Sequence, residues 1–194
     1  MIGKICPRGK RVGGLIRYLY ATGPAQQEGR RRRNPHTDPR VIGGFDDPAE
    51  LEPTVGESGR RDFRRLVALL EQPLAAAGVG PEKRPVYHLV IAARKDVETG
   101  AMVDRYLSDG EWRDIAATYL DQIGLAPRGD DLGVRWVAVR HADDHVHVVA
   151  TLARPPGRPA GVSPQRLLPG RRGLPRGRGH LRADRDRRQR PDRG

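Results

Sequence analysis

Apolar residues recur with helical spacing in three segments of the chain. Four of them, at positions i, i+3, i+4 and i+7 from Val12, predict a helix over residues 10–20. A second apolar face predicts a helix over residues 59–72, which we expect Pro73 to close. The third covers residues 108–124 and opens with the Ser-x-x-Glu spacing of a capping box.

Short apolar runs rich in β-branched residues predict strands over residues 85–93, 134–140 and 145–153. The last two are close enough to form an antiparallel hairpin. Residues 21–60 read as loop, and residues 94–107 as a short hairpin. This order predicts an α/β fold, an antiparallel or mixed sheet with flanking helices on one or both faces.

Length and charge divide the chain into a body and a tail. The chain has 194 residues and a net charge of +12, and residues 155–194 contribute 12 arginines and 3 aspartates, or +9 of that surplus. The body, residues 1–154, is expected to be one domain. The Arg/Gly/Pro-rich tail is expected either to be disordered or to be read out of frame, because a plus-one reading of permitted codons from Gln165 encodes an ordinary helix-like peptide. Its charge is therefore not evidence for DNA binding.

Two classes of protein are disfavoured. No stretch approaches the roughly 20 apolar residues of a membrane span, and the N-terminus lacks the apolar region of a signal peptide. The single cysteine, Cys6, excludes an intrachain disulfide. We therefore expect a cytoplasmic protein without membrane insertion.

Three of the six histidines, His141, His145 and His147, fall within seven residues. On a strand, His145 and His147 share one face, and a tight turn would bring His141 beside them. Three imidazoles with open positions are typical of a catalytic metal site, in which Asp143 or Asp144 could accept a hydrogen bond from a ligand imidazole. The alternative is a hairpin that is merely polar and exposed. Spacing alone does not name the metal, although imidazole prefers Zn, Cu, Ni or Fe.

The string from Arg140 to Leu152, His-Ala-Asp-Asp-His-Val-His at its centre, resembles the third motif of plasmid mobilisation relaxases of the MobA-like, actinobacterial type, in the HUH endonuclease superfamily. The resemblance implies an RRM-like sheet and a divalent ion, Mg or Mn, held by His141, His145 and His147. Of the two aspartates that could support a ligand imidazole, Asp143 is taken as a candidate catalytic residue. It also implies single-stranded DNA at a transfer origin as substrate, and an accessory mobilisation protein and a coupling protein as partners. The first histidine usually lies farther upstream in that family.

The same resemblance implies a tyrosine nucleophile near the N-terminus, which would form a 5′-phosphotyrosine with the cleaved strand. Tyr18 and Tyr20 both qualify, and helical periodicity does not choose between them. The run from Tyr18 to Gly23 resembles the first motif of the family and favours Tyr18, with Tyr20 as the alternative. Either tyrosine could instead pack the helix against the sheet.

Three further features carry weaker signals. The run Arg30, Arg31, Arg32 and Arg33 could contact DNA phosphates or simply be solvated. His36 lies in a segment that resembles a loop covering the site, and His88 reads as an ordinary sheet residue.

Two rivals remain beside a relaxase. One is a rolling-circle replication initiator or transposase with the same chemistry, against which the upstream tyrosine argues. The other is a truncated or decayed relaxase that binds metal or DNA without cleaving it.

Overall fold

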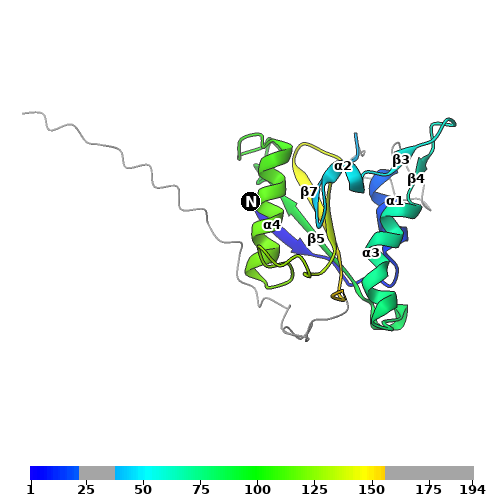
Figure 1. Cartoon of the computed structure of the whole chain (residues 1–194). Helices are drawn as coiled ribbons and strands as arrows, with labels where there is room; N and C mark the ends of the chain where they lie inside the picture. Colours follow the sequence, from blue (N-terminus) through cyan, green and yellow to red (C-terminus); the bar gives the residue numbers. More distant parts are fainter. Residues whose placement is uncertain (22–37, 156–194) are drawn as a thin grey trace, which may run out of the picture.

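The computed structural model describes residues 1–21 and 38–155. Its main sheet has the strand order β1-β5-β7-β6-β2, and every neighbouring pair is antiparallel. Helices α1 and α3 cover one face of the sheet and α4 covers the other (Figure 1), so the domain has three layers. The strands of the sheet are β1 (Ile2–Ile5), β2 (Arg40–Gly44), β5 (Val86–Ala92), β6 (Trp136–Arg140) and β7 (His145–Thr151).

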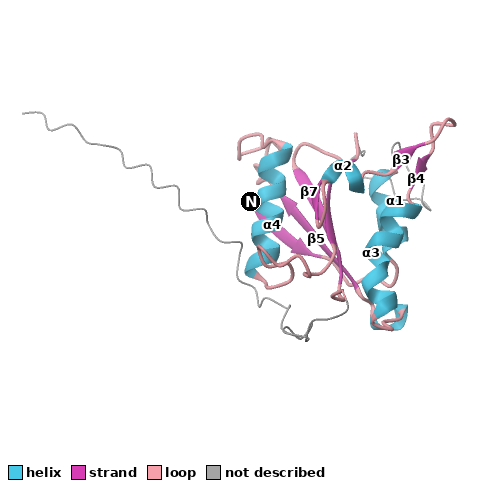
Figure 2. Ribbon diagram, in the orientation of Figure 1, coloured by secondary structure: helices cyan, strands magenta, loops and turns pink. Residues whose placement is uncertain are grey.

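The helices are α1 (Val12–Tyr20), α2 (Pro48–Leu51), α3 (Arg64–Ala76) and α4 (Asp109–Gln122), with a 3-10 turn at Pro81–Lys83. A two-stranded ribbon of β3 (Thr54–Val55) and β4 (Arg61–Asp62) precedes α3 and projects from the body (Figure 2). The structure confirms an α/β fold with an antiparallel sheet and flanking helices.

Alternation along β7 creates two separate apolar cores. Val146, Val148 and Ala150 pack beneath α4 together with Trp112. Val149, on the opposite face of the strand, packs with α1 and α3. Because side chains alternate along a strand, His145 and His147 lie on the α1/α3 face with Val149. β7 is the middle strand, so this pair sits at the centre of the sheet.

Most predicted elements are confirmed. The helix over 10–20, the helix over 108–124 and all three strands are present, and Ser108 and Glu111 form both hydrogen bonds of a capping box. Residues 94–107 contain the expected turn, in which Lys95 pairs with Met102.

The prediction that residues 21–60 are loop is wrong at β2, α2 and β3, and it holds at the other described residues of that segment. β2 is an edge strand whose two glycines, Gly43 and Gly44, hide its apolar alternation. A Cβ at either glycine would collide with a side chain of Arg113 or Leu51 respectively, so close packing excludes larger residues there. β1 was also missed, because all four of its residues are exposed and it lacks an apolar face.

Pro73 does not close α3, which continues to Ala76. Proline has no amide hydrogen, so the carbonyl of Leu69 loses its usual helical donor. The guanidinium of Arg135 donates to that carbonyl instead, at 2.5 Å. A side chain from outside the helix therefore satisfies the group that the proline leaves open, which a helix-ending rule does not anticipate.

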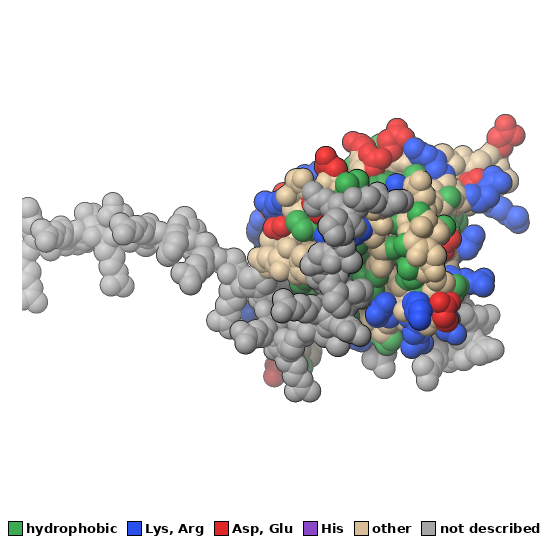
Figure 3. All heavy atoms as spheres, turned by 60° about the horizontal axis from the view of Figure 1, so that its bottom comes forward, with side chains coloured by type: hydrophobic (Ala, Val, Ile, Leu, Met, Phe, Trp, Pro, Cys, Tyr) green, Lys and Arg blue, Asp and Glu red, His purple; other side chains and the backbone are tan. Residues whose placement is uncertain are grey.

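The charge surplus of the chain lies outside the described residues. Those residues carry 20 basic and 20 acidic side chains, so the whole surplus of +12 belongs to residues 22–37 and 156–194. Figure 3 shows acidic and basic side chains on the same face of the body. Among the described helices, none is long and apolar enough to cross a membrane.

The Arg135 contact can be tested by a double-mutant cycle. Arg135→Met should lower the free energy of unfolding by about 1–3 kcal/mol, because a half-buried carbonyl loses its donor. In a Pro73→Ala background the new amide can serve Leu69, so the same substitution should cost clearly less. Urea denaturation of the four proteins measures both values. Equal costs in the two backgrounds would contradict this account of why α3 passes through Pro73.

Candidate metal centre

Three predicted ligands come together at one end of the sheet. β6 ends at Arg140, His141 follows it directly, and a turn over residues 141–144 leads into β7 at His145. One ligand nitrogen from each of His141, His145 and His147 lies within 4.8 Å of the other two. His141 therefore belongs to the histidine cluster, although it lies closer in sequence to the other two than the first histidine of relaxases usually does.

The three imidazole rings contact one another inside the protein. The ring of His141 stacks on that of His147, with centroids 4.7 Å apart. The ring of His145 meets both edge-on, at 4.8 Å and 5.1 Å. His141 is 2 % exposed and His147 is 9 % exposed. This burial contradicts the alternative interpretation, in which the histidines lie on an exposed polar hairpin. Burying imidazoles has a desolvation cost, which a surface hairpin would avoid.

A carboxylate fixes one of these rings. Asp144 Oδ1 lies 2.6 Å from Nδ1 of His145, and Lys95 Nζ lies 2.6 Å from the other oxygen of Asp144. Burial raises the pKa of Asp144, but the hydrogen bonds from Lys95 and His145 outweigh it and hold that pKa below its usual value. An ionised Asp144 accepts a hydrogen bond from Nδ1–H of His145, which leaves Nε2 as the nitrogen that can bind an ion.

Asp143, the other predicted acid, lies outside this contact. Its side chain is 78 % exposed and pairs with Arg140 at 3.5 Å. The hydrogen bond to an imidazole, for which the sequence left Asp143 and Asp144 as alternatives, is therefore made by Asp144.

A fourth histidine reaches the cluster from β5. Nε2 of His88 lies 2.8 Å from Nδ1 of His147, and the ring centroids are 5.1 Å apart, so the two rings meet end to end. Burial lowers the pKa of His88, which favours its neutral form. The sequence indicated only a sheet residue here. The one available signal was that His88 alternates with the apolar Tyr87 and Leu89, which places it on the other face.

The donor set fits a divalent transition metal. Imidazole binds such ions at about 2.1 Å, which in tetrahedral geometry separates the ligand nitrogens by about 3.4 Å. The observed limit of 4.8 Å is wider than this, so the rings would have to turn to bring the three nitrogens to bonding distance. Three protein ligands leave positions for water or substrate. The cluster could therefore hold a metal ion.

An ion-pair network braces the turn that carries His141. Arg140 is 6 % exposed and donates to the carbonyl of Ala142 at 3.1 Å and to the carboxylate of Asp109. Arg40 donates two hydrogen bonds to the same carboxylate, at 2.7 Å and 3.0 Å. Asp109 is the first residue of α4, so the network ties β2, β6 and α4 together beside the histidines.

The structure separates the two candidate tyrosines. Tyr20 is 5 % exposed, and its hydroxyl donates to Glu52 at 2.8 Å. Burial and the adjacent Glu52 carboxylate raise the pKa of Tyr20 well above its usual value, which makes its phenolate inaccessible. Tyr18, two residues earlier on α1, is 44 % exposed. Tyr20 is thus a packing residue, and Tyr18 is the candidate that a substrate can reach.

The C-terminal end of α1 lies at the same end of the sheet as the histidines. Glu52, the acceptor of the Tyr20 hydroxyl, also accepts the amide of Val41 at 2.6 Å. Val41 pairs with Val139 on β6, and Val139 pairs with His147 on β7. Two strand spacings correspond to roughly 10 Å. The helix that carries Tyr18 therefore covers the face, and reaches the end, at which the imidazoles meet.

Several predicted residues lie elsewhere. Arg30, Arg31, Arg32, Arg33 and His36 are outside the described residues, as is all of the tail beyond Pro155.

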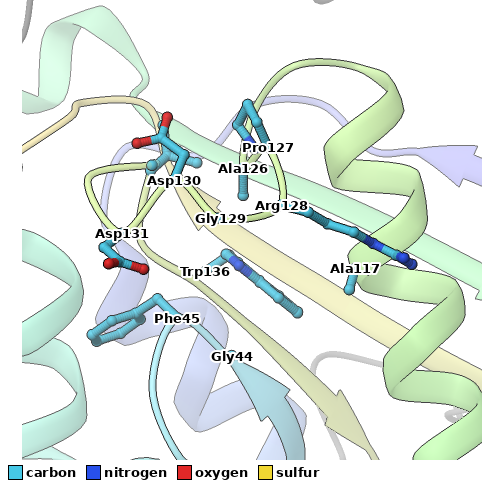
Figure 4. Close-up of a pocket in the computed structure, with 12 residues that line it drawn as sticks. Gly44, Phe45, Ala117, Ala126, Pro127, Arg128, Gly129, Asp130, Asp131 and Trp136 are labelled. Atoms are coloured by element: carbon cyan, nitrogen blue, oxygen red, sulfur yellow. The ribbon is translucent and has the colours of Figure 1, made fainter.

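A pocket of about 210 Å³ is lined by Trp136, Phe45 and Asp130, among others (Figure 4). Trp136 begins β6 and the histidine turn follows its end, so this pocket is a different place from the metal centre.

Comparison with models of known protein families, with curated protein sequences and with solved structures finds no match for this chain.

The two aspartates beside the cluster provide a matched test. Asp144→Asn should weaken binding of Zn²⁺ by roughly 10–100-fold, because the ligand His145 loses the charged acceptor that orients it. Asp143→Asn, one residue away and exposed, should leave the affinity within about threefold, since loss of such a surface pair has little effect. Isothermal titration calorimetry of the metal-free proteins measures both. The reverse order of effects would mean that Asp143 is the supporting carboxylate.

Proposed function

We propose that this chain is a relaxase, which cleaves and rejoins one strand of DNA at a transfer origin during conjugative mobilisation. The observation that supports it most is the convergence of His141, His145 and His147, with Asp144 bonded to His145, on the sheet face covered by the tyrosine-bearing helix. A tyrosine can act as the nucleophile of phosphodiester transfer, and a metal ion nearby would neutralise charge on the phosphate.

The proposed reaction begins with attack of the Tyr18 hydroxyl oxygen on the scissile phosphorus. The bond from phosphorus to the tyrosine oxygen forms as the bond to the 3′ oxygen of the preceding nucleotide breaks. The phenolic proton is lost, the departing 3′ oxygen gains a proton, and the strand remains attached through its 5′ phosphate. Because one ester replaces another, attack by a 3′ hydroxyl on the phosphotyrosine reverses the step without an external energy source.

Protein groups set the geometry of this step. His141, His145 and His147 would hold a divalent ion, which supplies charge neutralisation at the nonbridging phosphate oxygens. The resemblance to relaxases favours Mg or Mn, whereas imidazole ligands bind Zn or Ni more tightly, so availability would decide which ion is used. Asp144 holds His145 in one tautomer, and the Arg140 network holds the turn that carries His141.

Single-stranded DNA must also be held by positive charge. The described residues are balanced, at 20 basic and 20 acidic side chains. Arg30, Arg31, Arg32 and Arg33, between the tyrosine helix and β2, are the candidates in the body of the chain for phosphate contacts.

The position of the tyrosine favours a relaxase over a rolling-circle initiator or transposase. Tyr18 precedes the histidine strand by more than a hundred residues, whereas a downstream tyrosine is expected in those classes. Tyr106 and Tyr119 are the tyrosines nearest to the cluster in the sequence, and both precede it.

The proposal is tested by capture of a covalent adduct. The full chain is incubated with Mn²⁺ and a pool of random single-stranded oligonucleotides labelled at the 3′ end, and then denatured. A 5′-phosphotyrosine keeps the labelled fragment on the protein, so a labelled band should migrate with the chain. Tyr18→Phe and His147→Ala should each remove at least about 99 % of that band, because each eliminates one required chemical function.

Tyr20→Phe is the matched control. It removes only a buried hydrogen bond, so the adduct should persist while the free energy of unfolding falls by about 0.5–1.5 kcal/mol. An adduct that survives in Tyr18→Phe and is lost in a folded Tyr20→Phe protein would reverse the assignment. Metal binding with no adduct from any sequence in the pool would instead indicate a decayed copy that retains only the metal centre.

A further inference from the structure

His88 approaches the metal centre from outside the ligand set. Its Nε2 lies 2.8 Å from Nδ1 of His147, and the two ring planes are within 24° of parallel, with the rings end to end. The three convergent ligand nitrogens belong to His141, His145 and His147, and His88 is not among them. The ring of His88 therefore contacts His147 and lies outside the group of three convergent nitrogens.

The hydrogen bond restricts how His147 can bind an ion. Of the two ring nitrogens, Nδ1 is occupied by His88, so Nε2 is the one that can face the cluster. A neutral imidazole that binds metal through Nε2 carries its proton on Nδ1. Nδ1–H of His147 then donates a hydrogen bond to Nε2 of His88.

We propose that His88 is a positioning residue, which holds His147 as the Nδ1–H tautomer and fixes its ring plane so that Nε2 is presented to the metal ion. This inference rests on the proposed metal-dependent function and adds a residue to it. Metal-binding histidines characteristically donate their second N–H to a neighbouring acceptor, and loss of that acceptor weakens metal binding.

The surroundings of His88 argue against a purely packing role. The side chains of Val86 and Val149 belong to the core on this face, and Val149 is the cross-strand partner of His88. An aliphatic residue would fill such a position without the cost of burying an imidazole. The hydrogen bond to His147 gives the histidine a use that valine or leucine could not supply.

His88 and Asp144 support their ligands in different ways. Asp144 brings a negative charge to His145, with Lys95 on its other oxygen. His88 offers a neutral acceptor to His147. It orients that ligand without adding a second carboxylate, so more of the positive charge of the ion remains uncompensated for a phosphate oxygen.

Two substitutions separate orientation from packing. His88→Phe keeps an aromatic ring at this position and removes the acceptor, so affinity for Zn²⁺ and Mn²⁺ should fall by roughly 10–100-fold. His88→Gln places an amide oxygen near the position of Nε2, so affinity should stay within about threefold of the original. Calorimetry of the full chain without DNA measures both, and circular dichroism and thermal unfolding check that each variant is folded.

A second measurement uses the unaltered chain. Long-range ¹H–¹⁵N NMR of the Zn²⁺-loaded protein should show His147 protonated on Nδ1, and in His88→Phe that preference should weaken. A proton on Nε2 of His147 in the loaded protein, or a folded His88→Phe protein that binds both ions as tightly as the original, would overturn the proposal.

The outcome is independent of strand cleavage. If affinity depends on His88 but no covalent adduct forms in the assay above, the positioning role stands and the relaxase proposal fails. If the adduct forms and metal affinity is insensitive to His88→Phe, the relaxase proposal stands and the positioning role fails.

Discussion

Antiparallel pairing of β7 with both β5 and β6 is the constraint on which the metal centre depends. Pairing with β6 places Val139 opposite His147, and pairing with β5 places Val90 opposite it. Since alternation fixes which side chains share a face, a slip of one residue in either ladder would move the imidazoles of β7 relative to His141 and His88. The valines of β7 that pack under α4 hold that register, so the apolar core on one face positions the polar cluster on the other.

The sequence predicts the elements that carry strong local patterns. The capping box of α4, the apolar face of α1 and the alternation of β7 are all local, and all three predictions are confirmed. The missed elements lack such patterns, since β1 is wholly exposed and β2 contains paired glycines. The continuation of α3 through Pro73 depends on Arg135, which lies 66 residues from the carbonyl it satisfies. No local rule includes a donor that tertiary folding supplies.

The site divides in the same way. His141, His145 and His147 are neighbours in the sequence, so a strand and a tight turn suffice to predict their convergence. The role of His88 depends on the register between β5 and β7, across 59 residues, and local periodicity does not determine it. The sequence also left the two tyrosines and the two aspartates as alternatives. Burial of Tyr20 against Glu52 and the bond between Asp144 and His145 distinguish them, and both are tertiary contacts.

The described residues carry no net charge, so a metal centre would contribute more to the binding of DNA phosphates than the basic composition of the whole chain suggests. A domain whose described residues sum to zero has no long-range attraction for a polyanion from net charge alone. Beside any contribution of Arg30–Arg33, positive potential at the candidate site would come from a bound ion and from described residues such as Lys95 and Arg140. Both of these are already paired, with Asp144 and Asp109. A divalent ion between neutral imidazoles is therefore the strongest positive charge that this end of the sheet could offer to a phosphate, which is why supports that orient the ligands without neutralising the ion matter to the proposed chemistry.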